Sequence, residues 1–256
     1  MVSEKRFCVI RATVHGPAHH AAIVVVRGGA AAKMGHLLTR LDRARSPAHV
    51  TPIARRMIEV ISAHMSFPAS LVLRQLASPP LTDRVLAMLG SSGTAFYPLL
   101  HNSWNVIKIY AGEQPAGTPA QASVDLGVML LPGFTPEQLV TALRRIAGPG
   151  VDFEITVPGD TIPAQADLDL YGTLCEVLQE ADPNGIPFPL MMTSPTDARF
   201  FDRLGIQTYG FQPMKLPPDV DMALLPHSAD ERIPVEALNF GTEALYRLLH
   251  RFGENP

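Results

Sequence analysis

The order of the apolar segments in the first 157 residues limits the possible folds more than any other feature. Strands are predicted where apolar residues run together or alternate, and helices where they recur every three to four residues. The predicted order is strand 7–14, helix 29–41, helical segments 51–65, 69–76 and 81–89, strand 96–110, strand 122–131, a helix from 135, and strand 151–157. Without the helical segments in the middle, this is the β-α-β-β-α-β plan of a ferredoxin-like sandwich.

Two of these helices have clear start signals. Thr51 precedes Pro52 and Thr135 precedes Pro136, so each threonine is an N-cap candidate with proline at the first helical position. Gln138 lies three residues after Thr135, which is the spacing of a capping box. Helix N-termini are therefore predicted at both places.

The Pro- and Gly-containing segment 158–163 is typical of a domain boundary. Beyond it, the pattern predicts helix 168–178, strand 188–192, helix 198–204, strand 206–211 and a last helix that starts at Pro234. Two clear strands are few for a doubly wound domain. We therefore predict an α/β protein with a ferredoxin-like domain at 6–158, a helical insertion in it at about 50–92, and an incomplete αβα segment at 164–256.

Polar residues follow the apolar segments between 189 and 238. Thr196 and Asp197 come shortly after the strand predicted at 188–192, and a loop with His227, Asp230 and Glu231 leads into the last helix. In open α/β sheets, ligands bind outside the carboxyl ends of the strands. This stretch is therefore expected to form one wall of an active site.

The composition excludes several classes of partner. The net charge of −3 offers no basic excess for nucleic acid or for an acidic membrane surface. No apolar run reaches the roughly 18 residues of a membrane span. The only cysteines are Cys8 and Cys175, which suit a reducing, cytoplasmic setting better than a disulfide framework.

Two separated motifs give the chain a family resemblance. They are S-P-T-D-A-R-F-F-x-x-x-G-I-x-T-Y-G-F and, after it, H-x-x-D-E-R-I-x-V-E-x-L. Together they resemble the C-terminal portion of the di-zinc peptidases and amidohydrolases that include acetylornithine deacetylase, succinyl-diaminopimelate desuccinylase, glutamate carboxypeptidase and aminoacylase (metallopeptidase family twenty). The earlier pieces G-P-A-H-H, H-N-S-W and L-L-P-G-F-T-P-E-Q-L are similar to that family's dimerisation, or lid, domain. The resemblance extends from Arg6 to Phe252 and makes 164–256 a segment of the catalytic domain.

The resemblance implies specific roles for a few residues. His227 matches a zinc ligand, although a metal-free loop histidine is the alternative. His20 matches the lid histidine that stabilises the carbonyl oxygen of the transition state in the partner subunit's active site, and adjacent His19 competes for this assignment. Asn102, Thr196 and Asp197 match positions near the substrate, but Asp197 could equally cap the helix that follows it.

The departures from the family pattern concern the metal and the substrate carboxylate. The family's other zinc ligands and its general base precede the lid domain, whereas only about six residues precede the first lid strand here. Met129 stands where the family has an arginine, and Ala116–Pro119 stands where it has N-V-I-P. The chain alone is therefore expected to lack hydrolytic activity and to hold neither of the two zinc ions.

Two functional hypotheses remain open. The chain is either the C-terminal part of a zinc-dependent peptidase or amidohydrolase whose N-terminal half is separately encoded, or a non-catalytic dimerisation or binding module derived from such an enzyme. The resemblance implies a homodimer formed through the lid domain in both cases. The strand predicted at 96–110 is a candidate for the pairing edge.

Overall fold

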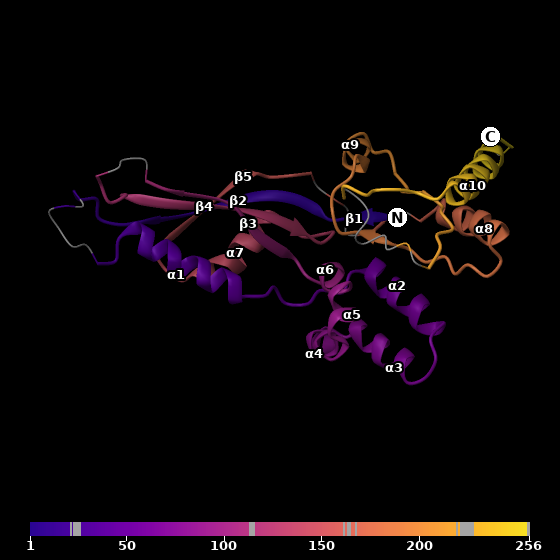
Figure 1. Ribbon diagram of the computed structural model, residues 1–256, viewed down its shortest axis with the longest axis horizontal. Coiled ribbons are helices and arrows are strands. Elements are labelled where there is room, and N and C mark those ends of the chain that lie inside the picture. The colour runs from indigo at the N-terminus through magenta and orange to yellow at the C-terminus, as the bar shows by residue number, and fades with distance from the viewer. Residues whose placement is uncertain are drawn as a thin grey trace. The chain divides into compact units, whose positions relative to one another are not determined.

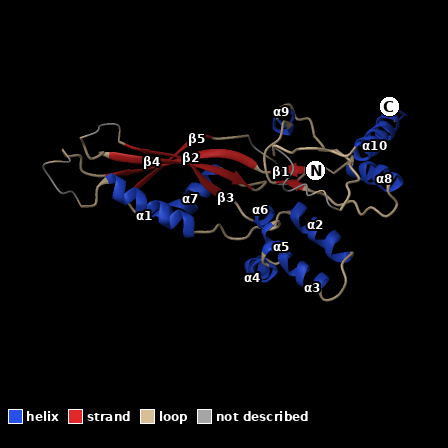
Figure 2. Ribbon diagram, viewed as in Figure 1, coloured by secondary structure: helices blue, strands red, loops and turns tan. Residues whose placement is uncertain are grey.

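The computed structural model describes residues 1–20, 22, 27–112, 116–160, 162, 165–166, 168–218, 220 and 228–254 (Figures 1 and 2). The chain divides into two compact units, each built from separate stretches of sequence. The larger unit comprises Ser3–Ala166 and Leu190–Thr208, and the smaller unit comprises Met1–Val2, Asp167–Pro189 and Tyr209–Pro256. The domain boundary predicted at 158–164 stays a prediction.

A four-stranded antiparallel sheet forms the centre of the larger unit. Its strands are β2 (Arg6–His15), β3 (Ser103–Ala111), β4 (Gln121–Leu130) and β5 (Val151–Val157), in the spatial order β3-β4-β2-β5. Helices α1 (Ala30–Arg43) and α7 (Pro136–Ala147) follow β2 and β4 in the chain. The predicted α/β class is confirmed, and the order β2-α1-β3-β4-α7-β5 matches the predicted β-α-β-β-α-β plan.

The core of the larger unit lies between the sheet and these two helices, which cover the same face of the sheet (Figure 2). Alternate residues of β2 and β4 point into this core because successive strand residues face opposite sides. The core residues are Cys8, Ile10, Ala12 and Val14 from β2, Ala122, Val124, Leu126, Val128 and Leu130 from β4, Met34, Leu37 and Leu41 from α1, and Leu139, Val140 and Leu143 from α7. The alternating apolar residues of the strands and the apolar residues at helical spacing thus pack together in one core layer.

Short helices fill the chain between α1 and β3. They are α2 (Pro52–Ala63), α3 (Ala69–Arg74), the 3-10 helix η1 (Gln75–Ala77), α4 (Pro79–Leu89), α5 (Ser91–Thr94) and α6 (Tyr97–Leu100). Thr51 caps α2 by accepting a hydrogen bond from the Ala54 backbone N–H. Thr135 and Gln138 form the capping box of α7. Both predicted helix starts are confirmed.

The strand predicted at 96–110 starts later than expected. Tyr97–Leu100 forms the short helix α6, and β3 begins only at Ser103. A proline lies in the first turn of α6, where a missing N–H costs nothing. The Lys5 ammonium group donates to the carbonyls of Pro98 and His101, which satisfies the end of this turn. A contact 93 residues away in the sequence therefore favours helix over strand here.

The prediction of a strand at residues 206–211 was wrong. Residues 206–211 are all described and none of them is in a strand. The Gly210 backbone instead exchanges hydrogen bonds with Met1, whose amino group donates to the Gly210 carbonyl while the Gly210 N–H donates to the Met1 carbonyl. The apolar residues of this segment made it look like a strand, but its backbone groups have other partners.

The strand predicted at 188–192 is present as a much shorter element. Only β6 (Met191–Met192) is in a strand, and it pairs in parallel with β1 (Ser3–Glu4). Helix α9 (Ala198–Asp202) follows in the same unit, close to the predicted helix at 198–204.

The smaller unit contains helices α8 (Tyr171–Ala181) and α10 (Val235–Glu254), which pack together. Arg251 of α10 forms ion pairs with Glu176 and Glu180 of α8. Ala237 and Ala244 of α10 are fully buried. No helix in the described ranges is long and apolar enough to cross a membrane.

Candidate functional site

Thr196 and Asp197 lie in the loop that leads into α9. The backbone N–H and the hydroxyl of Thr196 both donate to Oε2 of Glu4, at 2.7 and 2.5 Å. The Thr196 hydroxyl also accepts from the Ala198 backbone N–H and so caps α9. Asp197 is in the N-cap position, but its side chain makes no capping hydrogen bond. Thr196 therefore performs the capping role that the sequence also allowed for Asp197.

Glu4 is a buried carboxylate beside this loop. Its side chain is only 2% exposed, and its Oε1 has no hydrogen-bond partner among the described residues. Burial raises the pKa of Glu4, and the two hydrogen bonds from Thr196 oppose that shift only in part. Glu4 is thus the least satisfied buried polar group in the described part of the chain.

A cavity of about 380 Å³ adjoins Glu4. Asp160 lines it and forms ion pairs with Arg203 and, at 3.8 Å, with Arg199. Arg6 also lines it and donates to the carbonyls of Pro158 and Gly159. These charged side chains already have protein partners, so they hold the surrounding segments together.

Lys5 carries the opposite charge and points to a different part of the fold. It is fully buried, and its Nζ donates to the carbonyl oxygens of Pro98 and His101 at 3.0 and 2.8 Å. Burial lowers the pKa of Lys5 to about 8. Lys5 lies between β1 and β2, and its side chain reaches the turn before β3, whereas Glu4, at the end of β1, reaches the loop at Thr196.

Asn102 lies in that same turn and is buried. Its Oδ1 accepts a hydrogen bond of 2.7 Å from the backbone N–H of Leu131, directly after β4. The neighbouring His101 ring stacks on Tyr97 and lies 2.8 Å from the Asp83 carboxylate. Glu4 thus bonds to Thr196, while the adjacent Lys5 bonds to the carbonyl of His101, the residue before Asn102. We refer to Glu4, Lys5, His101, Asn102 and Thr196 as the junction cluster.

His20 lies far from the junction cluster. It is exposed and forms an isolated antiparallel bridge with Gly117, beyond the end of β2 at His15. The ten residues of β2 separate the two ends of the sheet by roughly 30 Å, at about 3.3 Å per residue. His227 lies outside the described residues. Asn102 and Thr196 thus each lie beside a neighbour or partner of the Glu4–Lys5 dipeptide, whereas His20 lies at the other end of the sheet.

Strand β3 is an edge of the sheet and has no strand partner on its outer side within the described ranges. Its side chains Val106, Ile107, Ile109 and Tyr110 are all exposed. An exposed, apolar edge strand is a ready surface for pairing with another chain.

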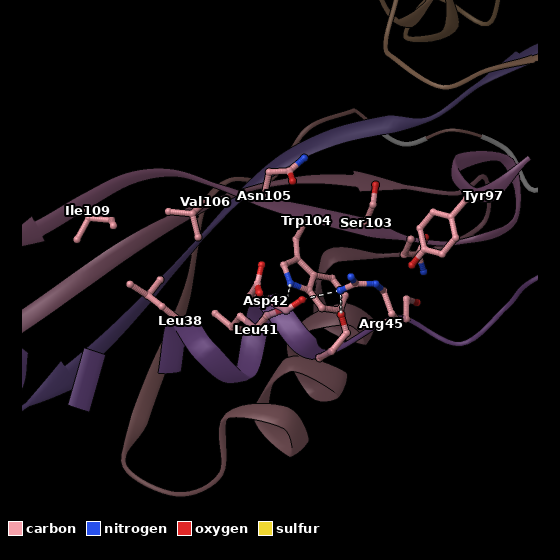
Figure 3. Close-up of a pocket in the computed structure, with 13 residues that line it drawn as sticks. Leu38, Leu41, Asp42, Arg45, Tyr97, Ser103, Trp104, Asn105, Val106 and Ile109 are labelled. Carbon is pink, nitrogen blue, oxygen red and sulfur yellow. Dashed lines mark hydrogen bonds between the residues drawn. The ribbon is translucent and has the colours of Figure 1, made fainter. Parts of the chain in front are cut away.

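A groove of about 630 Å³ lies beside this edge, between β3 and the C-terminal end of α1 (Figure 3). The Trp104 indole N–H donates to the Leu41 carbonyl, and Arg45 donates to the carbonyls of Asp42 and Ala44. These bonds fix the groove wall, which is also lined by the partly buried Leu38 and by the exposed Val106 and Ile109 (Figure 3). We refer to β3 and this groove as the open edge.

A zinc site needs three or more histidine, cysteine or carboxylate ligands in one place. Across the residues that the structure describes, no group of three such side chains is close enough to hold a metal ion. The described part of the chain therefore does not fit a complete zinc site.

Sequence patterns did not identify Glu4 and Lys5. A glutamate next to a lysine near the start of a chain normally predicts that both side chains are exposed to solvent. Burial of both is rare. The one available signal was their position directly before a buried strand. Their partners lie 93 to 192 residues away, which no local pattern reveals.

Comparison with known proteins gives one family match. A family model described as a peptidase dimerisation domain matches residues 2–150, which is more than half of the chain. No curated protein matches the chain.

Several solved structures are similar in fold. The dipeptidase Dug1p from Saccharomyces cerevisiae is 14% identical with a TM-score of 0.53, and the match covers 99% of this chain and 56% of that one. An M20 family metallo-carboxypeptidase from Sulfolobus solfataricus is 12% identical with a TM-score of 0.48, covering 80% and 56%. A tripeptidase from Staphylococcus aureus is 13% identical with a TM-score of 0.46, covering 97% and 52%. The chain thus spans about half the length of the solved structures that it matches.

Proposed function

Because the chain belongs to the M20 peptidase dimerisation-domain family, we propose that it is the lid and one wall of the catalytic domain of a zinc-dependent peptidase or N-acyl-amino-acid amidohydrolase. The observation that carries this proposal is the family match over residues 2–150, which includes the sheet and α1. The proposal keeps the predicted domains at 6–158, with their insertion at about 50–92, and at 164–256.

In this proposal, His227 is a zinc ligand and Asn102, Thr196 and Asp197 lie near the substrate. The link through Glu4 and Lys5 supports a common site for Asn102 and Thr196. His20 acts in the active site of the partner subunit, where it stabilises the carbonyl oxygen of the transition state. Its position at the opposite end of the sheet suits a role in trans, because it lies too far from Asn102 to serve the same site.

The proposed enzyme is a homodimer that pairs through the open edge. The apolar exposed side chains of β3 support this arrangement, since an edge strand of one copy extends the sheet of the next across a two-fold axis. The free cysteines Cys8 and Cys175 fit the cytoplasmic location that we propose for it.

Zinc binding and hydrolysis require the complementary part of the catalytic domain, with its remaining metal ligands and its general base. We propose that the chain alone is inactive and that a separately encoded polypeptide supplies the other half.

Zinc analysis and hydrolysis assays on the purified chain, alone and mixed with the polypeptide encoded directly upstream, test this function. We expect stoichiometric zinc and hydrolysis of dipeptides or N-acyl amino acids only in the mixture. A mixture that forms a complex yet neither binds zinc nor hydrolyses either substrate class would contradict it.

The second candidate function is a non-catalytic dimerisation module. Met129 favours it, because this side chain replaces an arginine of the family pattern at the end of β4, where its neighbours in the sheet are Phe7 and Ser103. A Met129→Arg variant separates the two functions. If the mixture is an enzyme, this variant changes the KM for substrates with a free carboxylate. If the chain is only a module, neither the variant nor the original hydrolyses anything.

A further inference from the structure

The His101 side chain is buried between two of the short helices that lie between α1 and β3 in the sequence. The residue itself is in the turn before β3 and is fully buried. Its Nδ1 lies 3.0 Å from the carbonyl oxygen of Tyr97 in α6, and its Nε2 lies 2.8 Å from Oδ1 of Asp83 in α4. The two ring nitrogens therefore join this turn to both helices.

Both partners of the His101 ring are hydrogen-bond acceptors. A carbonyl oxygen cannot donate, so Nδ1 must carry a hydrogen. The Asp83 side chain is 66% exposed, and an ionised carboxylate likewise accepts without donating, so Nε2 needs a hydrogen as well. A neutral ring has one N–H and would direct a lone pair at one of the two oxygens. The contacts therefore suit the doubly protonated imidazolium ring.

Other groups around the ring act in both directions. The titratable and charged groups near the His101–Tyr97 pair are Lys5 before β2, Arg45 after α1, His49 before α2, Asp83 in α4 and the Tyr97 phenol itself.

The Tyr97 ring is stacked on the His101 ring with centroids 4.1 Å apart, and an aromatic face attracts a cation. The Lys5 ammonium group, which donates to the His101 carbonyl, opposes a second positive charge. His49 does the same, and its own pKa is lowered by burial and then by His101. Among the described residues, the Asp83 carboxylate supplies the negative charge that balances these basic groups.

The ring also connects α4 to the groove of the open edge. Tyr97 and Asn102 line that groove, and His101 stacks on the first and precedes the second in the chain. If the ring lost the Nε2 hydrogen, a lone pair would face the Asp83 carboxylate and the two would repel. Asp83 is exposed enough to turn into solvent, which would free α4 from the turn, whereas the Nδ1 bond to Tyr97 would remain.

We propose that the His101–Asp83 pair is a pH-sensitive latch that holds α4 against the groove wall while the ring carries both hydrogens and releases it when the ring is neutral. The folded chain then binds this proton more tightly than the unfolded chain, so the stabilisation is present at low pH and is lost as the pH rises. This sign is opposite to that of Lys5, whose contribution grows with pH. The latch operates within this chain and does not depend on the proposed catalytic role.

Nitrogen-15 magnetic resonance of the histidine rings, between about pH 5 and 8, measures the state of the latch. His64 is an internal control, because its Nδ1 also lies near a carbonyl oxygen four residues earlier, at 2.9 Å, but its ring has no ion pair with a carboxylate among the described residues. We expect His101 to keep both ring hydrogens to a higher pH than His64 does. This comparison is made in the original chain and needs no variant.

Asp83→Asn tests the cause. Its amide group can donate to the Nε2 lone pair of a neutral ring, so His101 should bind its second proton about three- to tenfold more weakly than in the original chain. Glu59→Gln removes an exposed carboxylate of α2 and is the matched control, which should leave the titration of His101 unchanged. Hydrogen exchange of the α4 amides, corrected for the intrinsic effect of pH, should accelerate as His101 becomes neutral in the original chain but not in Asp83→Asn.

Three outcomes overturn the inference. The first is a His101 ring that loses its second hydrogen at the same pH as His64 or below it. The second is a titration of His101 that Asp83→Asn leaves unchanged. The third is hydrogen exchange in α4 that stays constant while His101 titrates, which would make the pair a static contact.

Discussion

At the scale of single residues, the junction cluster shows how burial changes the chemistry of ordinary side chains. Lys5 donates to carbonyl oxygens and pairs with no carboxylate among the described residues, so the loss of its hydration is offset only in part. Glu4 accepts two hydrogen bonds at one oxygen and none from the described residues at the other. Each side chain nevertheless fixes a segment that is distant in the sequence.

The lowered pKa of the buried Lys5 predicts that the stability of the folded chain depends on pH. Its pKa is lowered to about 8 in the folded chain, against an ordinary value near 10.5. Between these values the unfolded chain binds more protons, so the free energy of unfolding should rise with pH from about 8 to 10.5. The rise should be about 2–4 kcal/mol, since the pKa difference of about 2.5 units corresponds to about 1.4 kcal/mol per unit.

Urea unfolding of the original chain and of Lys5→Met at several pH values measures this contribution. The difference between the two should change with pH across that window. Lys33→Met on the exposed side of α1 is the control and should leave the pH profile unchanged. An identical profile for Lys5→Met and the original chain would contradict the prediction.

Thr196 predicts a loss of stability on removal of its hydroxyl. Thr196→Val keeps the shape of the side chain but loses the bond to Glu4 and the cap of α9. The free energy of unfolding should fall by about 1.5–3 kcal/mol, as for hydrogen bonds to charged groups. Thr196→Ser keeps the hydroxyl and should cost well under half as much in the same urea titration. Equal losses for valine and serine would show that the hydroxyl is not the cause.

At the scale of elements, β3 and α7 carry distinct predictions. Strand β3 lies at the edge of the sheet with apolar side chains exposed, whereas the other edge strand, β5, carries Asp152 and Glu154 among its residues. Charged residues on an edge strand discourage pairing with another chain. The two edges therefore differ in their capacity to bind a second copy.

If the chain forms the proposed homodimer, Ile107→Lys combined with Ile109→Lys should convert it to a monomer. Two charges on the pairing edge would have to approach their counterparts across the two-fold axis. Sedimentation velocity at micromolar concentration measures the change. Lys108→Gln, in the same strand, is the control and should remain dimeric. A monomeric original chain, or a dimeric double variant, would contradict pairing through the open edge.

The capping box of α7 predicts that loss of the Thr135 hydroxyl lowers the stability of the chain. Thr135→Ala removes the acceptor for the Gln138 N–H and should lower the free energy of unfolding by about 1 kcal/mol. Thr141→Ala, in the middle of the same helix, tests a threonine without a capping role and should change stability much less. Chemical denaturation of both variants makes the comparison.

At the scale of the whole molecule, the chain combines a complete sheet-and-helix core with surfaces that its own described residues leave uncovered. The core between the sheet, α1 and α7 is continuous and well buried. The open edge leaves apolar side chains of β3 exposed, which is typical of a surface that pairs with another chain. Its stability and its metal chemistry should therefore depend on partners to different extents.

Metal removal tests that division. EDTA should leave the thermal midpoint of the chain alone unchanged, because its described residues offer no cluster of three ligands. In the proposed complex with the complementary catalytic half, EDTA should lower the midpoint by several degrees, because a metal that binds only the folded state stabilises it. Differential scanning calorimetry measures both. A clear shift for the chain alone would contradict the proposed division of the zinc ligands.

The sequence by itself determined the features that depend on near neighbours. The alternating residues of β2 and β4, the caps at Thr51 and Thr135, and the order of strands and helices follow from side chains that lie two to four residues apart. The motifs around Thr196 and Asn102 also identified the family that the match over residues 2–150 supports.

Only the tertiary structure decided the features that depend on distant partners. Residues 206–211 form no strand because the backbone of Gly210 bonds to Met1, and α6 forms before β3 with Lys5 at its end. The junction cluster exists because Glu4 meets Thr196 across 192 residues of chain. Local patterns cannot specify such contacts, because a backbone or charged group takes whichever buried partner the folded chain brings within reach.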